Sequence, residues 1–206
     1  MTTPTGAQDH HEGSLVLLRH GETEWSRSGR HTGLTDLPLT VRGEQLGART
    51  STLLGGRAFS LVLTSPLQRA RRTAELVGLA DAQVDDNLME WDYGGYEGLT
   101  TNEIRDRVGH PWTVFDDGVI PGATPGESIE EVAARCRKVI DRVLPFLATG
   151  YVALVGHGHC LRILATVFLR QELRFGSQIL MDAGSVSVLG WEREVPVISS
   201  WNRTLH

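Results

Sequence analysis

The chain has only two cysteines, Cys136 and Cys160, and they do not form a CxxC pair. No secretory signal pattern accompanies them, so we expect no disulfide framework and a cytoplasmic location. Long apolar runs are also missing, and none approaches the roughly 20 residues that a membrane span needs. The formal net charge of −5 argues against a general nucleic-acid surface, which would need clustered lysine and arginine. We therefore expect neither a membrane nor a nucleic acid as a partner.

Repeats, low-complexity tracts and linkers are absent as well, which favours one folded unit. The 206 residues are enough for one sizeable core, and 40% apolar with 22% charged residues is ordinary for a globular protein. Residues 1–13 are polar and are expected to be a disordered N-terminal tail. Residues 14–206 are expected to form a single domain.

Short apolar segments alternate with segments of helical periodicity along this domain. The predicted strands are residues 14–18, 61–64, 83–85, 152–155 and 186–191, and the predicted helices are residues 40–54, 67–77, 100–108, 128–147 and 161–169. This alternation predicts an α/β fold, namely a three-layer α/β/α sandwich with a mainly parallel central sheet. Cys136 lies on the apolar stripe of the fourth helix, so it is expected to serve packing rather than chemistry.

Two predicted strands end at histidines. Arg19 and His20 follow the first strand, and His157 follows the fourth. Because the carboxyl ends of neighbouring parallel strands meet at one edge of a sheet, two imidazoles and a guanidinium are expected in one crevice. Glycines follow both histidines, where they allow backbone N–H groups to approach an anion closely. The pattern is typical of a catalytic site.

Six blocks in this order resemble the histidine phosphatase superfamily, also called the phosphoglycerate mutase-like family. They are residues 19–25, 29–40, 65–74, 90–98, 125–128 and 156–159. The resemblance extends over roughly residues 15–191. It implies the phosphoglycerate mutase-like fold and phosphoryl transfer, a reaction that suits fixed cationic donors because negative charge spreads over the phosphoryl oxygens.

On this interpretation His20 is the nucleophile, neutral at the attacking nitrogen, and the resemblance implies a phosphohistidine intermediate. Arg19 and Arg69 are expected to clamp the phosphoryl group. His157, which resembles the second site histidine of the family, is expected to donate to the developing charge. Glu90 is expected to protonate the leaving group and then to activate water.

The same resemblance implies further contacts to phosphate or substrate. These contacts are expected from Ser26, Thr32, Gly33, Tyr93 and Gly158, besides Arg19, Arg69 and His157. Ser26 stands where family members often have asparagine, so its reach and donor number are smaller. We expect no cofactor and no metal site, because arginines and histidines neutralise the charge that a metal neutralises elsewhere.

Each of these residues also has a simpler interpretation. Arg19 and His20 alone could form a surface turn, and Arg69 could belong to a solvated arginine-rich helix face. Glu90 could be an ordinary loop carboxylate. The His157-x-His159 pair could bind a metal, although no third ligand stands at a zinc spacing.

Two features favour a phosphatase over a phosphoglycerate mutase. The interval from Glu90 to His157 is short, and it lacks the adjacent arginines that grip a second anion in the mutases. Several motifs resemble the branch of sedoheptulose bisphosphatases and actinobacterial acid phosphatases, so small sugar phosphates are the expected substrates. Aromatic residues could pack on the carbon skeleton or in the core; they are Trp91, Tyr93, Tyr96 and Trp112. A mutase, a non-catalytic binding protein and a homodimer remain open.

Overall fold

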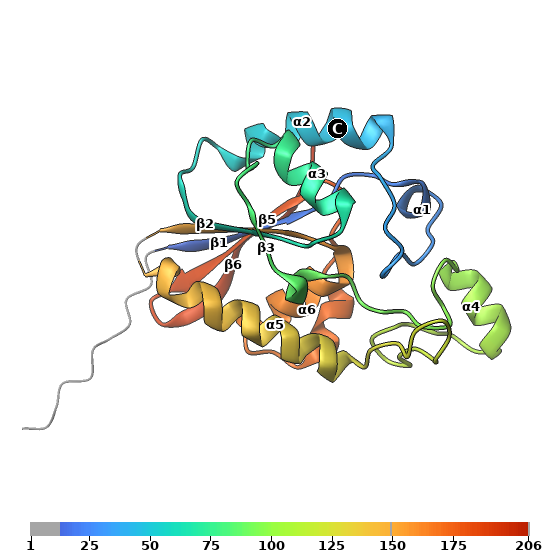
Figure 1. Cartoon of the computed structure of the whole chain (residues 1–206). Helices are drawn as coiled ribbons and strands as arrows, with labels where there is room; N and C mark the ends of the chain where they lie inside the picture. Colours follow the sequence, from blue (N-terminus) through green and yellow to red (C-terminus); the bar gives the residue numbers. More distant parts are fainter. Residues whose placement is uncertain (1–12, 149, 206) are drawn as a thin grey trace, which may run out of the picture.

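The computed structural model describes residues 13–148 and 150–205 and contains one six-stranded sheet (Figure 1). Its strand order is β3-β2-β4-β1-β5-β6. The strands are β1 (Ser14–Arg19), β2 (Phe59–Thr64), β3 (Gln83–Val84), β4 (Tyr151–Gly156), β5 (Val186–Glu192) and β6 (Val195–Arg203). The first four in sequence pair in parallel, and β5 and β6 add antiparallel pairs. The prediction of a mainly parallel sheet is confirmed.

Helices cover both faces of the sheet, with α2 and α3 on one side and α5 and α6 on the other (Figure 1). The α-helices are α1 (Glu24–Arg27), α2 (Val41–Thr50), α3 (Gln68–Leu76), α4 (Thr101–Val108), α5 (Ile129–Val143) and α6 (Gly158–Phe168). The 3₁₀ helices are η1 (Ser51–Leu54), η2 (Asp86–Leu88), η3 (Leu144–Leu147) and η4 (Leu173–Gln178). The predicted three-layer sandwich is confirmed.

Strand β1 lies in the middle of the core. Leu15 and Leu17 belong to the apolar cluster on one side of the sheet, while Val16 and Leu18 belong to the cluster on the other. This division follows from the alternation of side chains along a strand, and it explains why a strand covered on both faces is a continuous apolar run. The buried strand gives the residues after Leu18 a rigid support.

Helix α5 shows why the apolar stripe predicted a helix. Ser128 caps its first turn, accepting from the N–H of Glu131, whose carboxylate accepts in turn from the N–H of Ser128. The stripe then packs on the core, and Cys136 is fully buried there. Both cysteines are free thiols, with their sulfurs 4.0 Å apart.

The structure corrects the sequence prediction at several boundaries. Gly13, expected in the tail, is buried: its N–H donates to Leu147 at 3.1 Å, and a Cβ on it would lie 1.9 Å from the Gly150 carbonyl oxygen. The rest of the expected tail, residues 1–12, lies outside the described residues. Helix α6 begins three residues earlier than predicted, and α1 and β6 were not predicted. Among the described residues, no helix combines the length and the hydropathy that crossing a membrane requires.

Candidate active site

His20 lies directly after β1 and is only 4% exposed. Its Nδ1 is 2.7 Å from the carbonyl oxygen of Gly21. Because a carbonyl can only accept, Nδ1 carries the ring proton and Nε2 keeps a free lone pair. Burial, together with the charges of Arg69 and Arg19, holds the pKa of His20 well below its ordinary value. His20 is therefore a neutral imidazole with Nε2 available as a nucleophile.

Arg19, the last residue of β1, lies beside the start of α6. Its Nη1 donates to the carbonyl of Met181 at 2.5 Å, and its buried Nε has no acceptor among the described residues. A Cβ on Gly158 would lie 3.2 Å from the guanidinium carbon, so the absent side chain allows this close packing. The pKa of Arg19 is lowered by burial, which the negative charge of Glu90 partly offsets. Arg19 lines a cavity together with His20, Glu90 and Tyr93, and it retains donors that an anion in this cavity can use.

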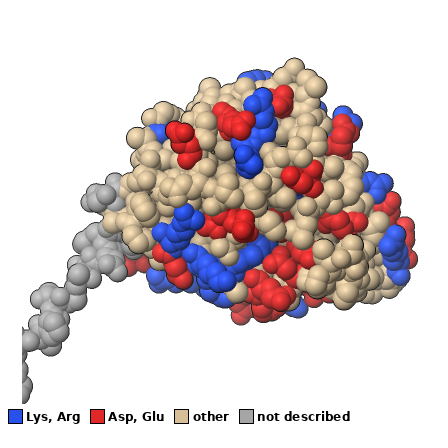
Figure 2. All heavy atoms as spheres, viewed as in Figure 1, with Lys and Arg blue, Asp and Glu red and all other residues tan. Residues whose placement is uncertain are grey.

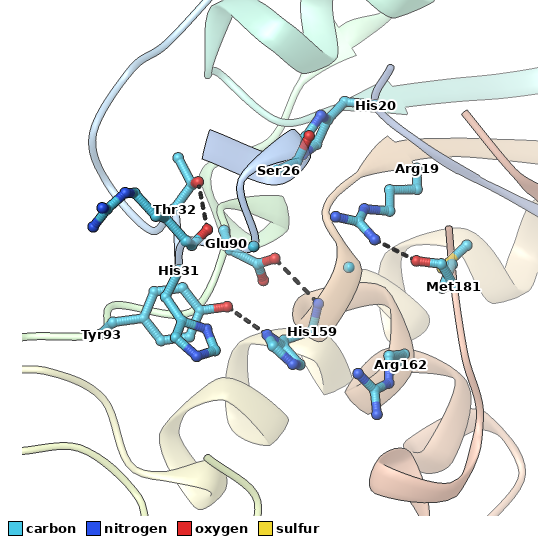
Figure 3. Close-up of a pocket in the computed structure, with 13 residues that line it drawn as sticks. Arg19, His20, Ser26, His31, Thr32, Glu90, Tyr93, His159, Arg162 and Met181 are labelled. Carbon is cyan, nitrogen blue, oxygen red and sulfur yellow. Dashed lines mark hydrogen bonds between the residues drawn. The ribbon is translucent and has the colours of Figure 1, made fainter. Parts of the chain in front are cut away.

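Glu90 is held at the N-terminus of α6 and is only 5% exposed. Its Oε1 accepts from the N–H groups of Trp91 and Cys160 at 2.9 and 2.8 Å. Within the described part of the chain, its Oε2 accepts only from the N–H of His159, at 3.1 Å (Figure 3). With one acceptor position of Oε2 still open, that oxygen is the one that can exchange a proton with a ligand. Glu90 is thus not an ordinary solvated loop carboxylate.

Arg135 on α5 fixes the segment that carries Glu90. Its Nε and Nη2 donate to both carboxylate oxygens of Glu127 at 2.8 and 3.0 Å. The same guanidinium donates to the carbonyls of Asn87, Met89 and Glu90. Such a paired, planar arrangement restricts the backbone on which the Glu90 side chain stands.

His157 lies behind the cavity wall, beside His20, with ring centroids 5.1 Å apart. Arg69 can only donate, so its Nε donates to Nδ1 of His157 at 3.2 Å. The proton of His157 is then on Nε2, which lies 2.7 Å from the Ser65 hydroxyl oxygen. Burial and the charge of Arg69 keep the pKa of His157 well below its ordinary value. Since both nitrogens have protein partners, the metal-pair interpretation has no support in this geometry.

Arg69 on α3 is fully buried, so it is not part of a solvated helix face. Its two terminal nitrogens donate to the carbonyls of Thr32, Gly33 and Thr35 at 2.9 to 3.2 Å. The structure thus places Arg69 between the loop after α1 and His157, rather than in the cavity lining. Its pKa is lowered by burial, while Glu90 raises it.

The other predicted binding residues divide into two groups. Ser26, Thr32, Tyr93 and Gly158 line the cavity. The Ser26 hydroxyl donates to the Thr23 carbonyl in the cap of α1, and the Thr32 hydroxyl donates to the Arg30 carbonyl. Gly33 does not line it; its N–H donates to the Glu97 carboxylate at 2.9 Å, and a Cβ on it would lie 2.5 Å from the Trp91 carbonyl oxygen.

Tyr93 and His159 meet on the wall opposite His20, with the Tyr93 hydroxyl 2.5 Å from Nδ1 of His159 (Figure 3). Burial raises the pKa of Tyr93 well above its ordinary value and lowers that of His159 well below, so both are neutral. His31 packs on the Tyr93 ring, and burial lowers its pKa to about 4. Of the four aromatic residues proposed as a substrate wall, only Tyr93 lines the cavity. The other three are buried in the core.

The cavity has a volume of about 180 Å³. Arg19, Arg30 and Arg162 line it, so positive charge is concentrated around it. Figure 2 shows acidic and basic side chains mixed over the face of the molecule drawn there. Six cavity-lining residues were not predicted: Gly29, Arg30, His31, His159, Arg162 and Met181. Two of them could have been predicted from the sequence. His159 and Arg162 are three positions apart near the start of α6, so they lie on one face of this helix.

Known proteins match almost the whole chain. Residues 15–204 match the family model of the histidine phosphatase superfamily (branch 1). An acid phosphatase of Mycobacterium tuberculosis is 36% identical over 203 residues, which cover 98% of this chain and 96% of the other. A sedoheptulose 1,7-bisphosphatase of Saccharomyces cerevisiae is 36% identical over 183 residues, covering 74% of this chain and 66% of the other.

A solved structure of an open reading frame product from Mycobacterium tuberculosis has a TM-score of 0.88 at 36% identity. It covers 95% of this chain and 100% of the other. Bacterial proteins named 2,3-bisphosphoglycerate-dependent phosphoglycerate mutase match as well. The resemblance that the sequence motifs indicated is confirmed.

Proposed function

This chain belongs to branch 1 of the histidine phosphatase superfamily, and we propose that it hydrolyses small phosphate monoesters, sugar phosphates in particular, through a phosphohistidine on His20. The observation that carries the proposal is the state of His20, a neutral imidazole with its free Nε2 at a cavity that also holds Arg19 and Glu90. Relatives named as phosphatases support hydrolysis as the reaction.

In the first step, the lone pair of His20 Nε2 attacks phosphorus and the bond from phosphorus to the ester oxygen breaks. The Nδ1 proton stays hydrogen-bonded to the Gly21 carbonyl, so the phosphorylated ring is a cation that this carbonyl stabilises. Arg19 donates to the phosphoryl oxygens, and the amide of Gly158 is a further donor, because first-turn amides have no acceptor within a helix. We propose that Glu90 gains a proton on Oε2 when the ester binds, and the leaving alkoxide takes that proton.

In the second step, water attacks phosphorus from the side that the alcohol has left. Glu90, now a carboxylate, takes the proton of that water at Oε2, and the bond from phosphorus to Nε2 breaks. Inorganic phosphate leaves, His20 returns to the neutral ring and Glu90 is protonated again. The positive groups of the cavity supply the charge neutralisation, so the proposed scheme needs no metal.

Arg69 and His157 receive revised roles in this proposal. The clamp expected of Arg69 has no support in its contacts, which hold the loop carbonyls of residues 32–35 and orient His157. Its charge acts on His20 by disfavouring the imidazolium. His157, expected as a donor to the phosphoryl group, packs beside His20 and accepts from Arg69 at Nδ1.

The test is a panel of phosphate esters assayed with and without EDTA, with interconversion of 2- and 3-phosphoglycerate measured beside it after priming with 2,3-bisphosphoglycerate. We expect phosphate release from sugar phosphates that EDTA does not change, and little interconversion. Interconversion that exceeds phosphate release by about tenfold, equal to about 1.4 kcal/mol of barrier preference, would contradict hydrolysis and favour the mutase.

A further inference from the structure

Arg162 is a cavity residue that the proposed reaction does not use. It lies on α6, half-buried, with its Nε donating to the Gly176 carbonyl at 2.7 Å and its guanidinium 4.6 Å from the centre of the Phe115 ring. Within residues 13–148 and 150–205 no carboxylate forms an ion pair with it. The Nε contact and the ring fix its direction, and its Nη1 and Nη2 are left for the cavity.

Burying part of the Arg162 charge costs free energy unless an opposite charge lies next to it. Burial lowers the pKa of Arg162 to about 10, so it stays charged at neutral pH. A partly desolvated charge without a partner is unfavourable, and a bound anion would remove that penalty. Arg30, another arginine that lines the cavity, already pairs with Glu103 at 3.2 Å.

The position of Arg162 separates it from the reacting atoms. Figure 3 shows Arg162 at the opposite end of the cavity from His20 and Ser26, with His159 beside it. It stands four residues after Gly158 on α6, which is about 6 Å along the helix axis. An anion held by Arg162 is therefore a different group from the phosphoryl group that His20 attacks.

We propose that Arg162 binds a second anionic group of the substrate, a carboxylate or a second phosphate on the carbon chain that carries the reacting ester. The inference deepens the proposed function and rests on it. A guanidinium donates two parallel hydrogen bonds to either kind of group, so the shared chemistry is a planar or tetrahedral oxyanion. The preferred substrates are then phosphate esters with two anionic ends.

Three esters are compared as substrates to test this proposal. Fructose 1,6-bisphosphate has a second phosphate, 3-phosphoglycerate has a carboxylate, and glycerol 3-phosphate has no second anion. The variants are Arg162→Gln, Arg162→Lys and, as the matched control, Arg174→Gln. Arg174 lies nearby on η4 but is exposed, pairs with Asp116 and does not line the cavity.

We expect Arg162→Gln to lower kcat/KM for a doubly anionic ester about 10- to 100-fold more than for glycerol 3-phosphate, mainly through KM, because one charge-assisted contact is lost. Arg162→Lys should recover part of the loss, and Arg174→Gln should behave like the wild type. The ester with the larger ratio identifies the second anion. Equal losses for all three esters, or no loss, would overturn the proposal, because a purely structural role does not distinguish them.

A binding measurement tests the role of Arg162 independently of whether the protein hydrolyses the esters. If the wild type releases phosphate from none of the esters, hydrolysis is wrong, and calorimetry on His20→Ala protein decides about Arg162. Weaker binding of the doubly anionic esters in the His20→Ala/Arg162→Gln protein supports the subsite. Binding that does not depend on Arg162, or no binding at all, overturns it.

Discussion

Four histidines around the cavity should make the fold sensitive to acid: His20, His31, His157 and His159. Burial lowers the pKa of each of them in the folded protein, that of His31 to about 4. In the unfolded chain each binds a proton near pH 6.5. Protonation therefore favours the unfolded state, and stability that is complete above pH 6.5 is lost as the pH falls towards the folded pKa values.

The expected loss is large. When the pH falls from 7.5 to 5.5, each histidine that stays neutral in the folded protein lowers the free energy of unfolding by about 1.4 kcal/mol. Four such histidines together lower the free energy of unfolding by about 5.5 kcal/mol, which is a large part of the roughly 5–15 kcal/mol that stabilises a typical domain.

Urea titrations at pH 7.5, 6.5 and 5.5 measure this loss. His31→Gln should remove about a quarter of it, since one of the four titrating rings is gone. His110→Gln is the matched control, because the His110 side chain is 53% exposed and the variant should keep the wild-type slope. A wild-type loss below about 1.4 kcal/mol, or the same slope in both variants, would show that the buried histidines do not control the acid sensitivity.

Three further predictions concern the site. Glu90→Gln should slow hydrolysis of alkyl phosphates about tenfold more than hydrolysis of p-nitrophenyl phosphate, whose leaving group needs less proton transfer; equal losses would show that Glu90 only orients the substrate. Gly158→Ala places a Cβ 3.2 Å from the Arg19 guanidinium carbon, so we expect a several-fold higher KM with little change in urea stability, and an unchanged KM would argue against Arg19 as a phosphate ligand. Arg135→Met breaks a paired contact to a carboxylate and should cost about 3 kcal/mol in urea titrations, whereas Arg137→Met, exposed on the same helix, should cost little. Similar losses in the two variants would contradict the proposed network.

The place of the site could be predicted from the sequence because it depends only on the order and direction of the strands. Strands β1 and β4 pair in parallel, with Arg19 opposite Gly156. Any residue that follows either strand must therefore lie at the same edge of the sheet. Two apolar runs, each followed by a histidine, are enough to predict that His20 and His157 come together.

The hydrogen-bond partners of Glu90 and Arg69 could not be predicted, because these partners come from distant parts of the chain. The Glu90 carboxylate accepts from amides that are 69 and 70 positions away in the sequence. The Arg69 guanidinium donates to the carbonyls of a loop more than 30 positions before it. The sequence suggested a phosphoryl clamp for Arg69, but it could not indicate that the side chain donates to His157 and to the carbonyls of residues 32–35. Strand β6 was missed because Pro196 and a run of polar residues are tolerated only at the edge of a sheet, a place that the sequence pattern does not reveal.

Trapping the phosphoenzyme tests whether His20 is the nucleophile. Wild-type protein, mixed briefly with a ³²P-labelled sugar phosphate and quenched in base, should carry a label that is stable in base and labile in acid, as a phosphohistidine is. The His20→Ala protein, folded as judged by circular dichroism, should carry none and should release no phosphate. Label at the wild-type level on the His20→Ala protein, or turnover without any label on the wild type, would show that His20 is not the phosphorylated residue.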